Sequence, residues 1–123
     1  VAWNGSRYIT VGWNGTIQTS QDGESWEACS SGTTMNLLDV TCNDSACVSI
    51  GSRTVLRSTD GLHWETVEMG LTQNIGNIIV SHGEFLFQSG DSLYRSDDGS
   101  NWKSEFAFHL NSSLTGGWIN CLR

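Results

Sequence analysis

One heptapeptide pattern occurs three times in the chain, at a constant interval of 38 residues. A fixed period of this length is typical of repeat proteins, in which each unit buries its faces against its neighbours. The pattern is Ser-x-Asp-Gly-x-x-Trp, and we therefore expect three similar structural units. The shared residues of the copies are Ser20, Asp22, Gly23, Trp26, Ser58, Asp60, Gly61, Trp64, Ser96, Asp98, Gly99 and Trp102.

The segments around the heptapeptides predict short β-strands. Runs rich in β-branched and aromatic residues lead up to Gly12, Gly51 and Gly90, and Asn-Gly pairs between such runs indicate tight hairpins. No segment has a convincing helical period, so no helix is expected. In the second unit, we expect strands near residues 37–42, 47–51, 54–58 and 63–67.

Four antiparallel strands in a unit of about 38 residues describe a β-propeller blade, and a solenoid of shorter units is the weaker alternative. The predicted fold is all-β, with three four-stranded blades and an extra C-terminal strand. We expect the blades at about 1–33, 34–71 and 72–110, and the first strand of a further blade at about 111–123.

Three blades leave two open faces, because closed propellers have about four to eight blades. Two interpretations follow. In the first, the chain is a protomer that associates with other copies of itself, by strand addition and blade stacking, into a ring or a filament. In the second, the chain is a piece of a longer propeller, and the missing blades belong to the rest of that chain.

The heptapeptide itself has the composition of a stabilised turn. Its Asp carboxylate can accept bonds from backbone N–H groups, its Gly can take a positive φ, and its Trp can bury a ring between blades. The pattern resembles that of the Asp-box, or BNR-repeat, family, whose Ser-x-Asp-x-Gly-x-Thr-Trp box occupies a turn of each propeller blade. Here Gly follows Asp directly, a form similar to that of exported bacterial propellers of undefined function. The resemblance covers all three units and implies a structural role for the shared residues.

Sialidases share the Asp-box, so we compared the sequence with the residues that a sialidase active site needs. Their site needs an arginine cluster, a Tyr–Glu nucleophile pair and an acid. Two of the five arginines here, Arg57 and Arg95, directly precede motif serines, which indicates that they are surface positions of the repeat and not part of such a cluster. The remaining arginines and the tyrosines are Arg7, Arg53, Arg123, Tyr8 and Tyr94. Other glycosidases need two facing carboxylates, and no spacing selects a pair among Asp39, Glu65, Glu68, Glu84 and Glu105. We expect no enzymatic activity, no catalytic residue and no cofactor.

No metal site is expected either. The histidines His63, His82 and His109 lie far apart in the sequence. The segment Asp97-Asp98-Gly99 is superficially like a calcium loop, but it lacks the alternating oxygen ligands and the distal Glu of such loops.

The cysteines and sequons favour an oxidising, extracellular setting. Cys42 and Cys47 flank four residues, as expected for a hairpin whose cysteines face each other and form a disulfide; two buried free thiols are the alternative. Cys29 and Cys121 are candidates for an intermolecular or out-of-chain disulfide. N-glycosylation sequons begin at Asn4, Asn14, Asn43 and Asn111.

The net charge and the aromatic residues limit which partners are expected. The net charge of −7 argues against nucleic acid, and no apolar run is long enough for a membrane span. We expect Trp3, Trp13 and Trp118 to pack between blades; the alternative is stacking on sugar rings, for which Trp13 is the strongest candidate. The predicted function is a non-catalytic secreted module for self-assembly and for protein or glycan binding. The alternative is a fragment of a larger exported protein, such as a sialidase-like glycoside hydrolase or an assembly factor.

Overall fold

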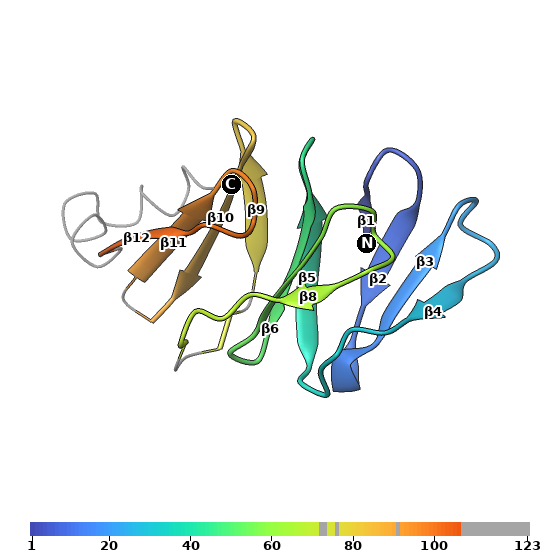
Figure 1. The fold of residues 1–123 in the computed structure, drawn as a ribbon, viewed down its shortest axis with the longest axis horizontal. Coiled ribbons are helices and arrows are strands. Elements are labelled where there is room, and N and C mark those ends of the chain that lie inside the picture. Colours follow the sequence, from blue (N-terminus) through green and yellow to red (C-terminus); the bar gives the residue numbers. More distant parts are fainter. Residues whose placement is uncertain (72–73, 76, 91, 107–123) are drawn as a thin grey trace.

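The computed structural model describes residues 1–71, 74–75, 77–90 and 92–106. These residues form three four-stranded antiparallel sheets, which lie side by side in chain order (Figure 1). The predicted all-β class and the prediction of four strands per unit are confirmed. The extra strand expected at about 111–123 lies outside the described residues.

Each sheet is a meander, because every strand pairs with its neighbours in sequence. Sheet A contains β1 (Ala2–Trp3), β2 (Tyr8–Val11), β3 (Ile17–Ser20) and β4 (Glu27–Cys29). Sheet B contains β5 (Leu37–Cys42), β6 (Cys47–Gly51), β7 (Val55–Ser58) and β8 (Glu65–Thr66). Sheet C contains β9 (Ile78–Ser81), β10 (Glu84–Ser89), β11 (Ser92–Ser96) and β12 (Lys103–Phe106).

The last strand of sheet B is shorter than the sequence suggested. The prediction placed it near residues 63–67, whereas β8 covers only Glu65–Thr66. The backbone N–H of His63 donates to the Asp60 carboxylate at 2.9 Å, so it belongs to the heptapeptide turn and is not available to the β-ladder. The turn therefore determines where the strand begins.

The hairpin between β2 and β3 contains one 3₁₀ turn, Trp13–Gly15 (η1), although no helix was expected. Asn14 and Gly15 both take positive φ angles, 58° and 71°, which match the Asn-Gly hairpin signal. At Gly15, a Cβ atom would collide with the carbonyl oxygen of Thr33, so only glycine fits this position.

Two apolar clusters hold the three sheets together. The first joins sheet A to sheet B and contains Ile9, Ile17, Leu37, Val40, Cys47 and Leu56. The second joins sheet B to sheet C and contains Val48, Ile50, Val55, Ile75, Ile78, Phe85 and Phe87. Successive side chains of a strand point to opposite faces, so Cys47 faces sheet A while Val48 faces sheet C. Sheet B is thus buried on both faces.

A backbone hydrogen bond repeats at the same end of both junctions. The N–H of Leu37 donates to the carbonyl of Gly12 at 2.9 Å, and the N–H of Ile75 donates to the carbonyl of Gly51 at 3.1 Å. A side-chain bond adds to the second junction, where the Asp39 carboxylate accepts the N–H of Ile78 at 3.0 Å. The repeated glycines therefore mark the point where the chain enters the next sheet.

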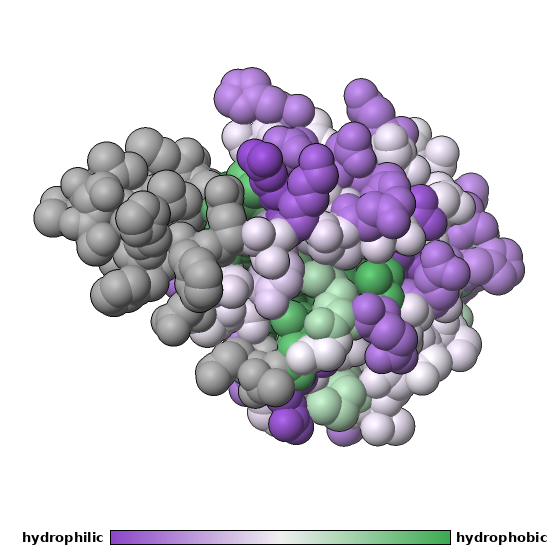
Figure 2. Space-filling view, turned by 60° about the vertical axis from the view of Figure 1, so that its left-hand side comes forward, coloured by the Kyte–Doolittle hydropathy of each residue, from purple (hydrophilic) through white to green (hydrophobic). Residues whose placement is uncertain are grey.

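Figure 2 shows hydrophilic residues mainly along the top and right of one face, residues of intermediate hydropathy over much of the rest, and hydrophobic residues gathered near its centre. Val67, Met69 and Leu71 are only partly buried and pack against the cluster between sheets B and C. None of the described residues forms a helix that is long and apolar enough to cross a membrane.

Candidate functional site

The three heptapeptide turns share one hydrogen-bond pattern, which the second turn illustrates. The Ser58 hydroxyl accepts the N–H of Gly61 at 2.8 Å and donates to the Asp60 carboxylate at 3.0 Å. The same carboxylate oxygen accepts the next two backbone N–H groups of the turn at 2.8 and 2.9 Å. The indole N–H of Trp64 donates to the carbonyl of Gly61 at 3.1 Å, and Gly61 has a φ of 81°. The first and third turns repeat every one of these bonds.

The bonds to the aspartate stabilise the ionised form of each carboxylate, because the serine hydroxyl and two backbone N–H groups donate to it. The backbone N–H groups of Ser25 and Glu24 hold the pKa of Asp22 below its ordinary value. The backbone N–H and then the ring of His63 lower the pKa of Asp60 strongly. The backbone N–H groups of Asn101 and Ser100 lower the pKa of Asp98 strongly, and the Asn101 side chain adds to them.

The second carboxylate oxygen distinguishes the turns. In the second turn it lies 2.7 Å from the His63 ring, and in the third it accepts the side-chain N–H of Asn101 at 2.9 Å. In the first turn, Ser25 stands at this position and makes no such bond. Each Asp therefore holds its own turn together, because its ionised carboxylate accepts two backbone N–H groups and the serine hydroxyl of that turn. No two of these carboxylates share a site.

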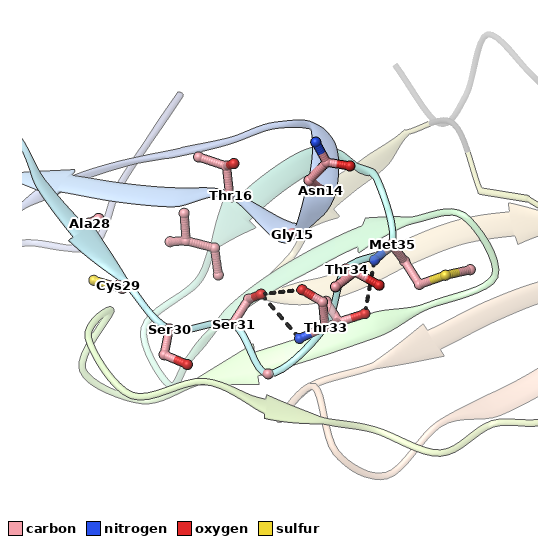
Figure 3. Close-up of a pocket in the computed structure, with 12 residues that line it drawn as sticks. Asn14, Gly15, Thr16, Ala28, Cys29, Ser30, Ser31, Thr33, Thr34 and Met35 are labelled. Atoms are coloured by element: carbon pink, nitrogen blue, oxygen red, sulfur yellow. Dashed lines mark hydrogen bonds between the residues drawn. The ribbon is translucent and has the colours of Figure 1, made fainter.

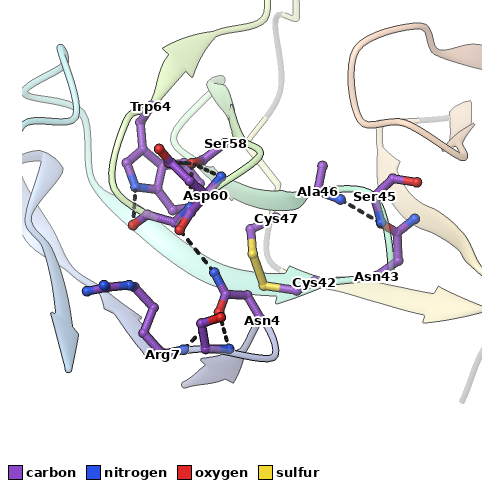
Figure 4. The surroundings of a disulfide bond; sticks show 12 residues. Asn4, Arg7, Cys42, Asn43, Ser45, Ala46, Cys47, Ser58, Asp60 and Trp64 are labelled. Carbon is purple, nitrogen blue, oxygen red and sulfur yellow. Dashed lines mark hydrogen bonds between the residues drawn. A yellow bond between two sulfur atoms is a disulfide. The ribbon is translucent and has the colours of Figure 1, made fainter. Parts of the chain in front are cut away.

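An asparagine at the start of a hairpin links sheet A to the turn of sheet B. The Asn4 side chain closes its own hairpin by accepting the N–H groups of Ser6 and Arg7 at 2.9 Å. Its amide then donates across the junction to the carbonyl of Asp60 at 3.1 Å (Figure 4). The side chain thus binds two loops from different sheets.

Asn43 makes the same link between sheet B and sheet C. Its side-chain carbonyl accepts the backbone N–H groups of Ser45 and Ala46. Its side-chain amide donates to the backbone carbonyls of Gly83 at 2.7 Å and Asp97 at 2.9 Å. In the sequence, both asparagines were recognisable only as the first residues of glycosylation sequons. Both amide hydrogens of Asn43 are engaged, so a glycan attached to this nitrogen would displace one of these bonds.

Arg57 reinforces the junction between sheets B and C. Its Nε donates to the carbonyl of Asp98 at 2.6 Å, and its guanidinium also lies 3.5 Å from the Glu65 carboxylate. A Cβ at Gly99 would lie 2.7 Å from Val48 and 3.5 Å from the stem of Arg57, so the third turn packs tightly on sheet B. The residue before the motif serine is therefore part of the inter-sheet contact.

Within the part of the chain that the structure describes, no sheet covers the outer face of sheet A, which is the side opposite sheet B. We define it by Trp3, Tyr8, Gln18 and Trp26. Trp3 and Tyr8 are cross-strand partners whose ring centroids lie 4.7 Å apart. Trp3 is 50% exposed and Tyr8 is 37% exposed.

The same register position is buried in the other two sheets. Tyr8, Cys47 and Phe85 each pair with the serine of their own heptapeptide. Cys47 is 2% exposed and Phe85 is 0% exposed, because the preceding sheet covers each of them. The exposure of Tyr8 therefore follows from the missing neighbour and not from its place in the sheet.

The turns show the same contrast. Trp64 and Trp102 pack against the two inter-sheet clusters, whereas Trp26 is 38% exposed, so the expected burial between sheets is wrong for Trp26. A Cβ at Gly61 would meet the amide of Asn4 at 2.8 Å, but a Cβ at Gly23 would meet only the ring of Tyr8, at 3.8 Å, in its own sheet.

Trp13 was expected to pack between units, and this is wrong as well: it is 73% exposed at the tip of the β2–β3 hairpin. Trp3 likewise lies on the surface, and Trp118 is outside the described residues. The other two units have polar residues, Ser52 and Asp91, at the position that Trp13 occupies in the first, so packing between the sheets does not require an aromatic ring there. The ring is therefore available for a planar ligand.

An open hollow of about 810 Å³ lies beside this hairpin (Figure 3). Its lining is mostly small hydroxyl residues and backbone. The Ser31 hydroxyl donates to the carbonyl of Thr33 at 3.1 Å and accepts its N–H at 3.2 Å, so this loop uses its hydroxyls to hold its own shape. The hollow brings no acidic, basic or histidine side chain together.

The predicted disulfide between Cys42 and Cys47 is confirmed, and it closes the β5–β6 hairpin (Figure 4). A disulfide indicates an oxidising compartment. Cys29 is a partly buried free thiol, and Cys121 lies outside the described residues. Among the described residues, no three His, Cys, Asp or Glu side chains are grouped as a metal site.

The remaining site predictions fall into two groups. Asn14 lies in the exposed hairpin turn, where its backbone N–H donates to the Asn36 side chain at 3.0 Å. His63 and His82 lie in surface turns. His109, Asn111 and Arg123 lie outside the described residues.

Comparisons with known proteins do not assign the chain to a group. No family model matches the sequence, and no curated protein matches it significantly.

Proposed function

We propose that the chain is a non-catalytic, secreted module of the Asp-box propeller type, whose role is self-assembly by the stacking of its sheets. The observation that carries the proposal is the uncovered outer face of sheet A. Its Tyr8 stands at a register position that is buried at both existing sheet junctions. An aromatic face of this kind on a soluble protein is typical of an interaction surface.

The three carboxylates support the absence of catalysis in this proposal. Asp22, Asp60 and Asp98 lie on separate turns, and backbone donors occupy each of them. A glycosidase needs two carboxylates that face each other across one bond. The repeated hydrogen bonds favour a structural role for all three.

The stacking of further sheets would continue the arrangement that joins sheets A, B and C. In a propeller, each blade covers one face of the next, and the ring closes when no face is left open. Copies of this chain would supply those blades in a ring or a filament. A longer parent chain would supply them in the alternative, in which this chain is part of a larger exported enzyme or assembly factor.

The native mass in solution tests the proposal. We expect light scattering without reductant to give about twice the chain mass of 13.5 kDa, or larger species that grow with concentration. A mass of 13.5 kDa at every concentration would contradict self-assembly and would favour the longer parent chain.

Glycan binding is a second candidate function, and the exposed indole of Trp13 favours it. Flat aromatic rings on a surface bind planar apolar faces of ligands, and a sugar ring presents one. A glycan array should then show signals that Trp13→Ala removes and Trp3→Ala keeps. An array without any signal would exclude this function.

A further inference from the structure

The two ends of the sheet stack carry complementary groups. At the sheet A end, the outer face presents Trp3, Tyr8 and Trp26, and the carbonyl of Asp22 has no donor within the described part of the chain. Its counterparts are both bonded across a junction: the carbonyl of Asp60 accepts from Asn4, and that of Asp98 accepts from Arg57.

At the sheet C end, Arg95 is the counterpart of Arg57. Each arginine directly precedes a motif serine, and each pairs with the second strand of its sheet, Arg57 with Val48 and Arg95 with Leu86. Arg57 reaches forward to the turn of the following sheet. Arg95 is exposed and makes no hydrogen bond or ion pair with the described residues.

We propose that a second copy of the chain binds head to tail, with Arg95 of one copy donating to the Asp22 carbonyl of the other, over the aromatic outer face of sheet A. This inference rests on the proposed self-assembly and names its surfaces. The bond would repeat that of Arg57 to Asp98, which measures 2.6 Å within the chain. Such a contact uses different surfaces on the two copies and is therefore heterologous.

One difference from the internal junctions sets the strength of this contact. Ser81 stands at the position that Asn4 and Asn43 occupy in the other sheets, directly before the hairpin turn. Its hydroxyl lies 3.2 Å from the His82 ring, and a serine has one donor hydrogen where an asparagine amide has two. The copy-to-copy junction therefore has Arg95 but lacks the amide, and it is weaker than the junctions within the chain.

The test measures self-association of the full chain by sedimentation velocity over a range of concentrations. We expect Arg95→Ala to weaken association by about tenfold or more, because it removes a charged donor. Trp3→Ser should weaken it by a similar factor of about ten, since aromatic anchors dominate interfaces. Arg53→Ala is the matched control, because Arg53 is exposed in the β6–β7 hairpin at the other end of the strands, and it should leave association unchanged. Circular dichroism confirms that each variant is folded.

Mixing the two variants separates head-to-tail binding from other arrangements. The Arg95→Ala copy keeps an intact sheet A face, and the Trp3→Ser copy keeps its arginine, so the mixture should regain one complete junction per pair and associate more tightly than either variant alone. Ser81→Asn should strengthen association, because it supplies the missing amide.

The other outcomes overturn the inference at different levels. Association that neither variant weakens would overturn these surfaces and leave self-assembly standing. Weakened variants that do not complement each other would overturn the head-to-tail geometry. A wild-type chain that stays monomeric would overturn the inference together with the proposed function.

Discussion

The first and second heptapeptide turns have the same internal bonds but different surroundings. In both, a serine and an aspartate bind the backbone of the turn, and an indole N–H binds the glycine carbonyl. The second turn is covered by Asn4 of the preceding sheet, whereas the first is open to solvent. The heptapeptide thus specifies its own turn, and the neighbouring sheet specifies whether that turn is part of a core.

The largest expected effect comes from the tryptophans of these two turns. Trp64→Ala should lower the free energy of unfolding by about 3 kcal/mol, because its ring packs against the cluster between sheets A and B. Trp26→Ala, the matched variant on the open turn, should lower it by about 1 kcal/mol or less. Urea unfolding at low protein concentration measures both. Equal losses would mean that the two turns do not differ in burial as described.

The asparagines of the two junctions provide the next comparison. Asn43→Ala removes two donors and two acceptor bonds and should lower the free energy of unfolding by about 2 kcal/mol. Asn4→Ala removes the same number of acceptor bonds, two, but only one inter-sheet donor bond, so it should lower the free energy of unfolding by about 1 kcal/mol less than Asn43→Ala does. Thermal and urea unfolding of the two variants check the order, and a larger loss for Asn4→Ala would reverse this assignment.

Glycine substitutions separate the conformation of the turn from its coverage. Gly23 and Gly61 have φ angles of 82° and 81°, so alanine strains both by about 1 kcal/mol. At Gly61 the new Cβ would also press on Asn4 at 2.8 Å and on Ile9 at 3.2 Å, which should add about 1 kcal/mol. The difference between Gly61→Ala and Gly23→Ala in urea unfolding reports this coverage alone, and a difference of zero argues against it.

Acid titration should give the smallest difference. The folded-state pKa of each motif aspartate lies below its unfolded value, so the stabilisation is complete above about pH 5 and is lost as the pH falls through the folded-state pKa. Asp60 and Asp98 bond an additional side chain, His63 or Asn101, while Asp22 does not. Asp98→Asn should therefore remove more of the acid-side pH dependence than Asp22→Asn does. Unfolding measured from pH 6 down to pH 3 tests this, and unchanged slopes in both variants would show that these carboxylates are not responsible.

Local sequence signals predicted the local structure well. The strands near residues 37–42 and 47–51 and the disulfide at their hairpin depend on neighbouring residues, and β5, β6 and the Cys42–Cys47 bond lie where expected. The fourth strand of sheet B was predicted too long, because a turn residue, His63, gives its N–H to a side chain.

The contacts between sheets could not be read from the sequence in the same way. Asn4 and Asn43 match a glycosylation sequon, and nothing in the tripeptide shows that the amide reaches a carbonyl more than 50 residues away. The repeat itself contained a signal, because both asparagines stand one residue after the counterparts Trp3 and Cys42. The exposure of Trp3, Trp13 and Trp26 depends on which neighbour is present, and the composition of a strand does not record this.

Hydroxyl-radical footprinting of the tryptophans tests most directly whether the outer face of sheet A is an association surface. Trp3 and Trp26 lie on that face, while Trp13 lies at the opposite end of the strands and serves as an internal reference. We predict that oxidation of Trp3 and Trp26 decreases as chain concentration rises, while oxidation of Trp13 stays constant. Oxidation of all three that is independent of concentration, in a chain shown by its mass to associate, would contradict the assignment of this face.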